Sequence, residues 1–320
     1  RFSKFTKAIA ATAIGTVMYG ASLLGGDIAN GIHEGKAAVS DSHAEVHDIY
    51  TDVTDLYPLY RTHATFVLTG LGTKDPSKTA EALAIHHDVG RVFGVEYSNK
   101  DLNTLDIATR TIETAKANNI TEISLDGYSA GGPIGIDVAA HIHRMAPEIK
   151  IISIILNSSP LGKDSLTAKS RDGIDIMENI MDINEDFAYY EHGHIAVETF
   201  NRNAAYLERT DVPYDELTVT SWNTVAYNKV AYTIDYSKAI EEVRSVADKL
   251  NESQAASARL IQQQARHIVR SDYRNNINDL PDDVLFIYTR SEDSAADTVV
   301  DVENGEKVFI DVMEELERPF

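Results

Sequence analysis

The chain has 320 residues, of which 43% are hydrophobic and 25% are charged, a composition typical of globular proteins rather than disordered ones. A formal net charge of −21 argues against binding of nucleic acid, whose phosphates such a surface would repel, and we attribute it to an acidic, soluble surface. The chain has no cysteine, which excludes disulfides, thiolate catalysis and cysteine-ligated zinc or iron–sulfur sites.

The first predicted element is the uncharged stretch of residues 8–26, which follows Arg1, Lys4 and Lys7. Positive residues before such a stretch are typical of a signal peptide or an N-terminal signal anchor. As a helix, residues 8–26 would just cross the hydrocarbon layer of a membrane, which takes about 20 residues. The alternative is a helix of small residues packed on the domain, because the stretch is rich in Ala, Gly and Thr. We expect residues 1–26 to anchor the protein in a membrane or to direct its export.

Residues 27–61 are polar, and we expect a linker that ends in an element at the edge of the fold. His43 and His47 stand four residues apart, the spacing of two ligands on a helix, but no partner in the sequence completes a metal site. We therefore expect the histidines of this segment to be solvated and the protein to bind no metal.

Strand-like and helix-like segments then alternate along the chain. Four short runs rich in β-branched and other apolar residues predict strands at residues 64–69, 92–97, 123–126 and 149–156. Helix-like segments lie between them and after the third of them. This alternation predicts an α/β fold with a doubly wound, mostly parallel sheet and right-handed crossovers.

The alternation stops at residue 161 and returns at residue 282. We interpret residues 161–281 as a large insertion, because their patterning is mostly helical and they are rich in tyrosine. Residues 284–288 then predict another strand, and the chain closes with an amphipathic helix. The core of the fold is therefore expected to comprise residues 62–160 and 282–320.

The most informative motif is Gly127-Tyr128-Ser129-Ala130-Gly131, which lies where a predicted strand gives way to a predicted helix. Gly-x-Ser-x-Gly at such a junction is the nucleophile elbow of serine hydrolases. The turn lifts the serine hydroxyl above the sheet and leaves no room for a Cβ two residues before or after it, which explains Gly127 and Gly131. The following helix begins with free N–H groups that can stabilise a developing anion.

The motif and the alternation together resemble the α/β-hydrolase family, over roughly residues 64–160 and 283–316. The insertion at residues 161–281 would be the helical cap that many members carry. The resemblance implies that Ser129 is the nucleophile and that no cofactor takes part.

The resemblance also implies an oxyanion hole made of two backbone N–H groups. One belongs to Ala130, the residue after the nucleophile, and the other to Leu71, in the turn after the first strand. The family often has His-Gly in that turn, where this chain has Thr69-Gly70. We expect the difference to be tolerated, because the backbone provides the donor.

The acid of the triad would follow the strand at residues 284–288. The resemblance favours Asp293, with Asp297 as second choice, and one of the two is expected to be an ordinary turn residue.

The base would be a histidine downstream of the acid, and no histidine follows His267. Three interpretations stay open. We favour a truncated chain whose histidine lies beyond Phe320, because both ends look cut. In the second interpretation, a histidine of the cap has replaced the usual base. In the third, the protein has lost catalysis and uses the fold for binding. The cap histidines considered are His192, His194 and His267.

The resemblance thus implies a serine hydrolase that acts on an ester, thioester or amide through an acyl-enzyme at Ser129. Its partner would be a small-molecule ester or acyl substrate. Residues 8–26 would make it membrane-anchored with an extracytoplasmic catalytic domain, or secreted. The alternatives are a catalytically inactive hydrolase-like binding domain and an acyltransferase using the same site. The substrate depends on the cap and pocket rather than on the fold.

Overall fold

The computed structural model describes residues 43–50, 62–84, 91–168, 170–171, 174, 207–209, 224–227, 230–234, 237–238, 241, 256, 258–290 and 299–320. The chain divides into two compact units. The core unit comprises Asp41–Arg171 and Leu260–Phe320, and the second unit comprises Arg1–Ser40 and Asp172–Arg259.

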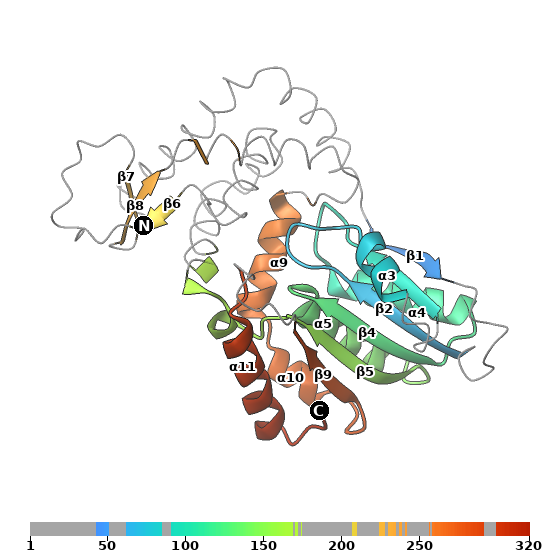
Figure 1. The fold of residues 1–320 in the computed structure, drawn as a ribbon. Helices are drawn as coiled ribbons and strands as arrows, with labels where there is room; N and C mark the ends of the chain where they lie inside the picture. Colours follow the sequence, from blue (N-terminus) through green and yellow to red (C-terminus); the bar gives the residue numbers. More distant parts are fainter. Residues whose placement is uncertain are drawn as a thin grey trace, which may run out of the picture. The chain divides into compact units, whose positions relative to one another are not determined.

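The core unit is built on a six-stranded sheet with the order β1-β3-β2-β4-β5-β9 (Figure 1). β1 pairs antiparallel with β3 at the edge of the sheet, and all other pairs are parallel. The strands are β1 (Glu45–Tyr50), β2 (His63–Leu68), β3 (Arg91–Glu96), β4 (Glu122–Tyr128), β5 (Lys150–Asn157) and β9 (Leu285–Thr289). The predicted doubly wound, mostly parallel sheet is therefore confirmed, and the five strands predicted from the sequence match observed strands to within two residues.

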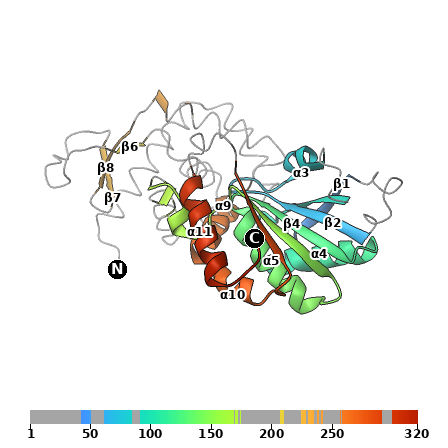
Figure 2. The ribbon, with the colours of Figure 1, turned by 60° about the horizontal axis from the view of Figure 1, so that its bottom comes forward.

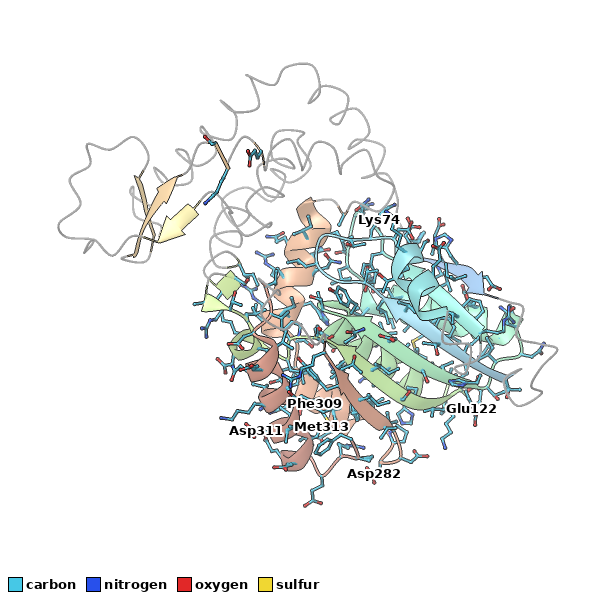
Figure 3. The ribbon with its side chains drawn as sticks, viewed as in Figure 1. Lys74, Glu122, Asp282, Phe309, Asp311 and Met313 are labelled. Atoms are coloured by element: carbon cyan, nitrogen blue, oxygen red, sulfur yellow. The ribbon has the colours of Figure 1, made fainter. Side chains whose placement is uncertain are left out.

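Helices connect these strands and cover the sheet. They are α3 (Ser77–Ala84), α4 (Thr104–Ala117), α5 (Gly131–Met145), the 3₁₀ turn η4 (Lys163–Ser165), α9 (Ala258–Arg270), α10 (Tyr273–Asn278) and α11 (Val302–Glu315). α5 packs on β2, β4 and β5, with α4 and α10 against it, and Figures 1 and 2 show α4 and α5 along one face of the sheet. On α11, Phe309 and Met313 are buried while Asp311 is exposed, so one side of this helix faces the core (Figure 3).

A row of large apolar side chains crosses the sheet on the face that α5 covers. In register, one residue from each of five neighbouring strands contributes to it: Phe93, Phe66, Leu125, Ile154 and Phe286. Each is at most 1% exposed, and the rings of Phe66 and Phe93 stack with centroids 5.0 Å apart. A slip of one residue would turn this row to the other face, so the row fixes the register of the strands.

The next row toward the carboxyl ends of the strands has a gap at its centre. It runs through Val95, Leu68, Gly127, Leu156 and Tyr288. A Cβ at the central glycine would overlap the backbone of the first residues of α5. The missing side chain therefore allows the N-terminus of α5 to lie directly against the end of β4, which is where the motif lies.

The second unit contains a three-stranded antiparallel sheet in the order β6-β8-β7. Its strands are β6 (Leu207–Arg209), β7 (Thr224–Tyr227) and β8 (Val230–Ile234). This sheet lies within the predicted helical insertion, where the sequence pattern had not indicated strands. β7 and β8 are nevertheless rich in β-branched and aromatic residues, a strand signal that the helical pattern around them outweighed.

The predicted N-terminal anchor, residues 8–26, lies outside the described residues, so it stays a prediction. Among the helices that the structure describes, none combines the length and the apolar character needed to cross a membrane.

Candidate active site

Ser129 lies in the turn between β4 and α5, as the motif predicts. Its φ is +51°, in the left-handed region where a residue other than glycine is strained by about 1–3 kcal/mol. The surrounding backbone holds this conformation: the N–H of Ser129 donates to the carbonyl of Asn157 at 2.8 Å, and its carbonyl accepts from the N–H of Gly132 at 3.0 Å. The hydroxyl forms no hydrogen bond with any residue in the described part of the chain. The backbone of Ser129 is therefore held in a strained conformation, and its hydroxyl has no hydrogen-bond partner among the described residues.

The glycines around Ser129 are needed because the backbone is crowded. A Cβ on Gly131 would overlap the carbonyl of Leu68, and one on Gly132 would lie 2.9 Å from the side chain of Leu156. Ser159, two residues after the end of β5, also lies close to this turn, and its hydroxyl donates to the carbonyl of Gly127 at 2.8 Å. The steric reason predicted for glycine at this turn is thus confirmed.

The turn after β2 lies against Ser129, the predicted nucleophile. A Cβ built on Gly70 would lie 2.9 Å from the Cβ of Ser129, so only glycine allows this approach. Gly72 has φ +81°, which also favours glycine. Within the described residues, the N–H groups of Leu71 and Ala130 have no hydrogen-bond partner. The two predicted oxyanion donors are therefore unpaired there: Ala130 follows Ser129 in the chain, and Leu71 follows Gly70, whose backbone lies against Ser129.

His267 on α9 is the one predicted base candidate that the structure describes. Its Nε2 lies 3.1 Å from Oδ2 of Asp137 and 3.3 Å from the carbonyl of Pro133, both on α5. The other carboxylate oxygen of Asp137 accepts from Ser271 at 3.0 Å. A cavity of about 410 Å³ beside this pair is lined by neither Ser129 nor Leu71. In this structure His267 joins α9 to α5, and it forms no hydrogen bond with Ser129.

The remaining triad candidates, Asp293, Asp297, His192 and His194, lie outside the described residues. Their roles stay predictions.

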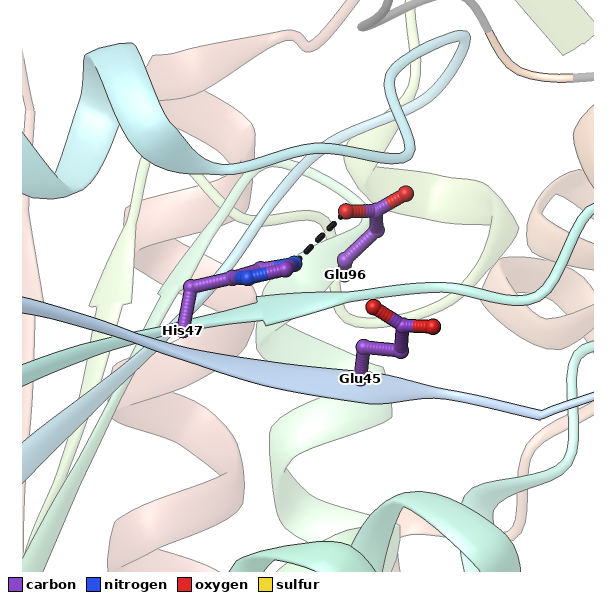
Figure 4. A group of neighbouring side chains, drawn as sticks. All are labelled: Glu45, His47 and Glu96. Carbon is purple, nitrogen blue, oxygen red and sulfur yellow. Dashed lines mark hydrogen bonds and ion pairs between the residues drawn. The ribbon is translucent and has the colours of Figure 1, made fainter.

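A histidine–carboxylate cluster lies at the sheet edge, on β1 and β3 (Figure 4). Nε2 of His47 is 2.7 Å from Glu96, and Glu45 faces Glu96 directly across the two strands. Nζ of Lys74 lies 2.7 Å from the second oxygen of Glu96. Because Lys74 neutralises Glu96 and His47 forms a hydrogen bond with it, we assign the cluster as a network built on the Lys74–Glu96 ion pair. The sequence could not reveal these partners to His47, since they come from the facing strand and from a separate loop.

Asp126 is a buried carboxyl group three residues before Ser129. It is 5% exposed, and its Oδ1 has no hydrogen-bond partner among the described residues. In register it lies between Val67 and Ile155, on the sheet face opposite α5. Burial raises the pKa of Asp126 to about 6. The sequence did contain a signal for this group, a single acidic residue inside an otherwise apolar strand.

No family model matches the chain, and no curated protein matches it. Similar solved structures include a carboxylesterase of the ammonia-oxidizing thaumarchaeon Nitrososphaera gargenis, at 14% identity and TM-score 0.45, over 88% of this chain and 85% of that one. Another is a lipase-esterase related protein from Clostridium acetobutylicum, at 11% identity and TM-score 0.45, over 87% of this chain and 88% of that one. A third is a bacterial membrane phospholipase A, described as a virulence factor, at 14% identity and TM-score 0.44, over 94% of this chain and 83% of that one. At these identities and TM-scores we draw neither activity nor substrate from the likenesses.

Proposed function

We propose that this chain, which has the α/β-hydrolase fold, is a serine hydrolase that cleaves an ester, thioester or amide through an acyl-enzyme at Ser129. The observation that carries the proposal is the strained φ of +51° at a serine between a central parallel strand and a helix. A structural role would not need a serine there, because glycine would adopt the same conformation without strain. The two unoccupied N–H groups beside it support the same conclusion.

The reaction follows from these groups. The Oγ of Ser129 attacks the carbonyl carbon of the substrate while a histidine base takes its proton. The N–H groups of Leu71 and Ala130 stabilise the oxyanion of the tetrahedral intermediate. The intermediate collapses to the acyl-enzyme, and the leaving alcohol, thiol or amine takes the proton from the base. Water then attacks the acyl-enzyme in the same way and releases the acid. The base is a histidine beyond Phe320, as favoured from the sequence, or one of His192, His194 and His267, and its acid partner is Asp293 or Asp297.

The proposal places the enzyme at a membrane or outside the cell, because residues 8–26 follow three positive residues. A fluorophosphonate probe applied to fractionated cells tests both parts. We expect a labelled band of this chain in the membrane or extracellular fraction, lost in the Ser129→Ala variant. Labelling that survives Ser129→Ala contradicts the nucleophile, and a labelled band confined to the soluble cytosol contradicts the location.

The same experiment separates the alternatives. A chain that folds but is never labelled points to a binding domain without catalysis. An acyltransferase is labelled like a hydrolase, but its acyl-enzyme persists until an acceptor other than water is added.

A further inference from the structure

Gln264 is a fully buried side chain of α9 that binds the turn after β2. Its Nε2 donates to the carbonyls of Gly70 and Thr73, both at 3.2 Å, and its Oε1 accepts from the N–H of Gly72 at 3.1 Å. The side chain is 0% exposed. One carboxamide thus uses both its donor and its acceptor on the backbone of residues 70–73, which we call the oxyanion turn.

The oxyanion turn has few other constraints. It contains two glycines, and the half-buried Leu71 is its only large apolar side chain. Thr73 donates its N–H to Gly70 at 3.3 Å, and the hydroxyl of Thr69 donates to the carbonyl of Thr73 at 3.1 Å. These two bonds also satisfy the carbonyls that Gln264 binds. The N–H of Gly72 has no partner in the described residues other than Gln264.

The position of this turn determines the position of the Leu71 N–H relative to Ser129. Gly72 follows Leu71 directly, and Gly70 before it touches the nucleophile. The N–H of Gly72 is partly buried, and a fully buried N–H that loses its only partner is disfavoured by about 1–3 kcal/mol, so loss of Gln264 favours a rearrangement of the turn that satisfies the Gly72 N–H elsewhere. Such a rearrangement would carry the Leu71 N–H with it.

We propose that Gln264 is a positioning residue that holds the oxyanion turn, and with it the Leu71 N–H, in place beside Ser129. The catalytic consequence rests on the serine hydrolase function proposed above, whereas the effect on the turn does not. Gln264 touches no reacting atom and acts only through the backbone of the turn.

The neighbouring Gln263 provides a matched control. Its Oε1 accepts from the N–H of Leu102, and its Nε2 donates to Asp101, both at 2.5 Å. It therefore binds a different loop from the same helix with the same chemistry. Methionine has nearly the shape of glutamine without its hydrogen-bonding groups, so Gln264→Met and Gln263→Met remove equivalent interactions from two loops.

The first measurement is hydrogen exchange by mass spectrometry on the full chain. We expect peptides covering residues 69–74 to exchange at least about tenfold faster in Gln264→Met and at the wild-type rate in Gln263→Met. Unchanged protection of residues 122–128 in β4 shows that each variant is folded. Equal exchange of residues 69–74 in wild type and Gln264→Met overturns the proposal.

The second measurement is hydrolysis of a short p-nitrophenyl ester. Removing one oxyanion donor typically costs about 100–1000-fold in rate, and displacing one should cost at least about tenfold in kcat, with KM nearly unchanged. The Gln264→Glu variant keeps the acceptor for Gly72 but sets a carboxylate against two carbonyls. We expect its kcat, relative to wild type at the same pH, to recover as the pH falls and the carboxyl group becomes a donor.

The outcomes separate this inference from the proposed function. Faster exchange in Gln264→Met with wild-type kcat overturns the positioning role in catalysis. A wild-type chain that neither hydrolyses esters nor reacts with the fluorophosphonate overturns the proposed function. In that case the exchange measurement still decides whether Gln264 holds the turn.

Discussion

Asp126 is a buried carboxyl group on β4, three residues before Ser129. Its carboxyl group is 5% exposed, has one oxygen with no partner in the part of the chain that the structure describes, and has a pKa raised to about 6 by burial. In an unfolded chain an aspartate has a pKa of about 4. Between these two values the folded protein binds more protons than the unfolded chain, so rising pH disfavours the folded state.

We predict that stability falls as the pH rises from about 4 through about 6, by roughly 3 kcal/mol from this one group. The Asp126→Asn variant removes the titration, so its free energy of unfolding relative to wild type should increase by this amount across that range. Urea unfolding of both proteins at several pH values measures the difference. A difference that stays constant from pH 4 to pH 7 would show that Asp126 is not buried as described.

At the residue scale, the sequence predicted what local spacing determines. Ser129, Gly127 and Gly131 were found because the elbow requires them within five consecutive positions. Gln264 was not found, because its partners at residues 70–73 are far away in sequence and nothing in an amphipathic helix marks one glutamine among several. The Asp137–His267 pair was missed for the same reason.

At the element scale, the junction of β4 and α5 depends on where glycine is essential. Gly127 has the backbone of Gly131 and Gly132 where its Cβ would be, and backbone cannot move aside cheaply. Gly135, one turn further along α5, would place a Cβ at ordinary distances of 3.7 Å and 4.0 Å from Leu68 and Leu125. The two positions therefore form a matched pair within one junction.

We predict that Gly127→Ala lowers the free energy of unfolding by about 3 kcal/mol or more and abolishes esterase activity, because α5 must shift away from β4. Gly135→Ala should instead raise it by about 0.5–1 kcal/mol with activity retained, since alanine favours a helix interior more than glycine does. Urea unfolding and p-nitrophenyl ester hydrolysis check both variants. Equal effects of the two substitutions would mean that the junction is not packed as the structure shows.

The strands and helices of the core were predicted well because burial imposes clear patterns on them. β5, for example, is an almost continuous apolar run, as a strand covered by helices must be. β6, β7 and β8 were missed because strands of three to five residues give too short a pattern to stand out against a helical background.

At the scale of the whole molecule, α9 belongs with the core unit although it lies within the predicted cap. Compact packing resumes at Leu260, whereas the sequence placed the return of the core at residue 282. The reason is chemical: Gln263, Gln264 and His267 all bind core residues from this one helix. Their side chains give α9 a polar appearance in the sequence, which hides the contacts.

Because α9 belongs with the core unit, the residues to delete in testing whether the insertion selects the substrate are 172–257. An insertion after β5 leaves the sheet at the carboxyl ends of its strands, where α/β proteins bind ligands, and its tyrosines offer apolar rings with a polar tip. We therefore predict that replacing residues 172–257 by a short glycine–serine linker flattens the preference among acyl chain lengths. With a base outside residues 172–257, hydrolysis of short esters should stay within about threefold of wild type, because Gln264 and the oxyanion turn remain in place, whereas loss of all hydrolysis would assign the base to His192 or His194.

The longer deletion of residues 161–281 is the informative comparison, since it also removes η4, α9 and α10 of the core unit. We expect it to lower kcat on every ester by at least about tenfold, short ones included, because the oxyanion turn loses the side chain that holds it. Kinetics on a series of p-nitrophenyl esters, with thermal unfolding as a check on folding, distinguish the two deletions. If the shorter deletion keeps the wild-type preference across acyl chains, the insertion does not select the substrate. If both deletions retain wild-type kcat on short esters, α9 is dispensable for catalysis. We therefore expect α9 to be needed for the reaction itself and residues 172–257 to be needed only for selecting the acyl chain.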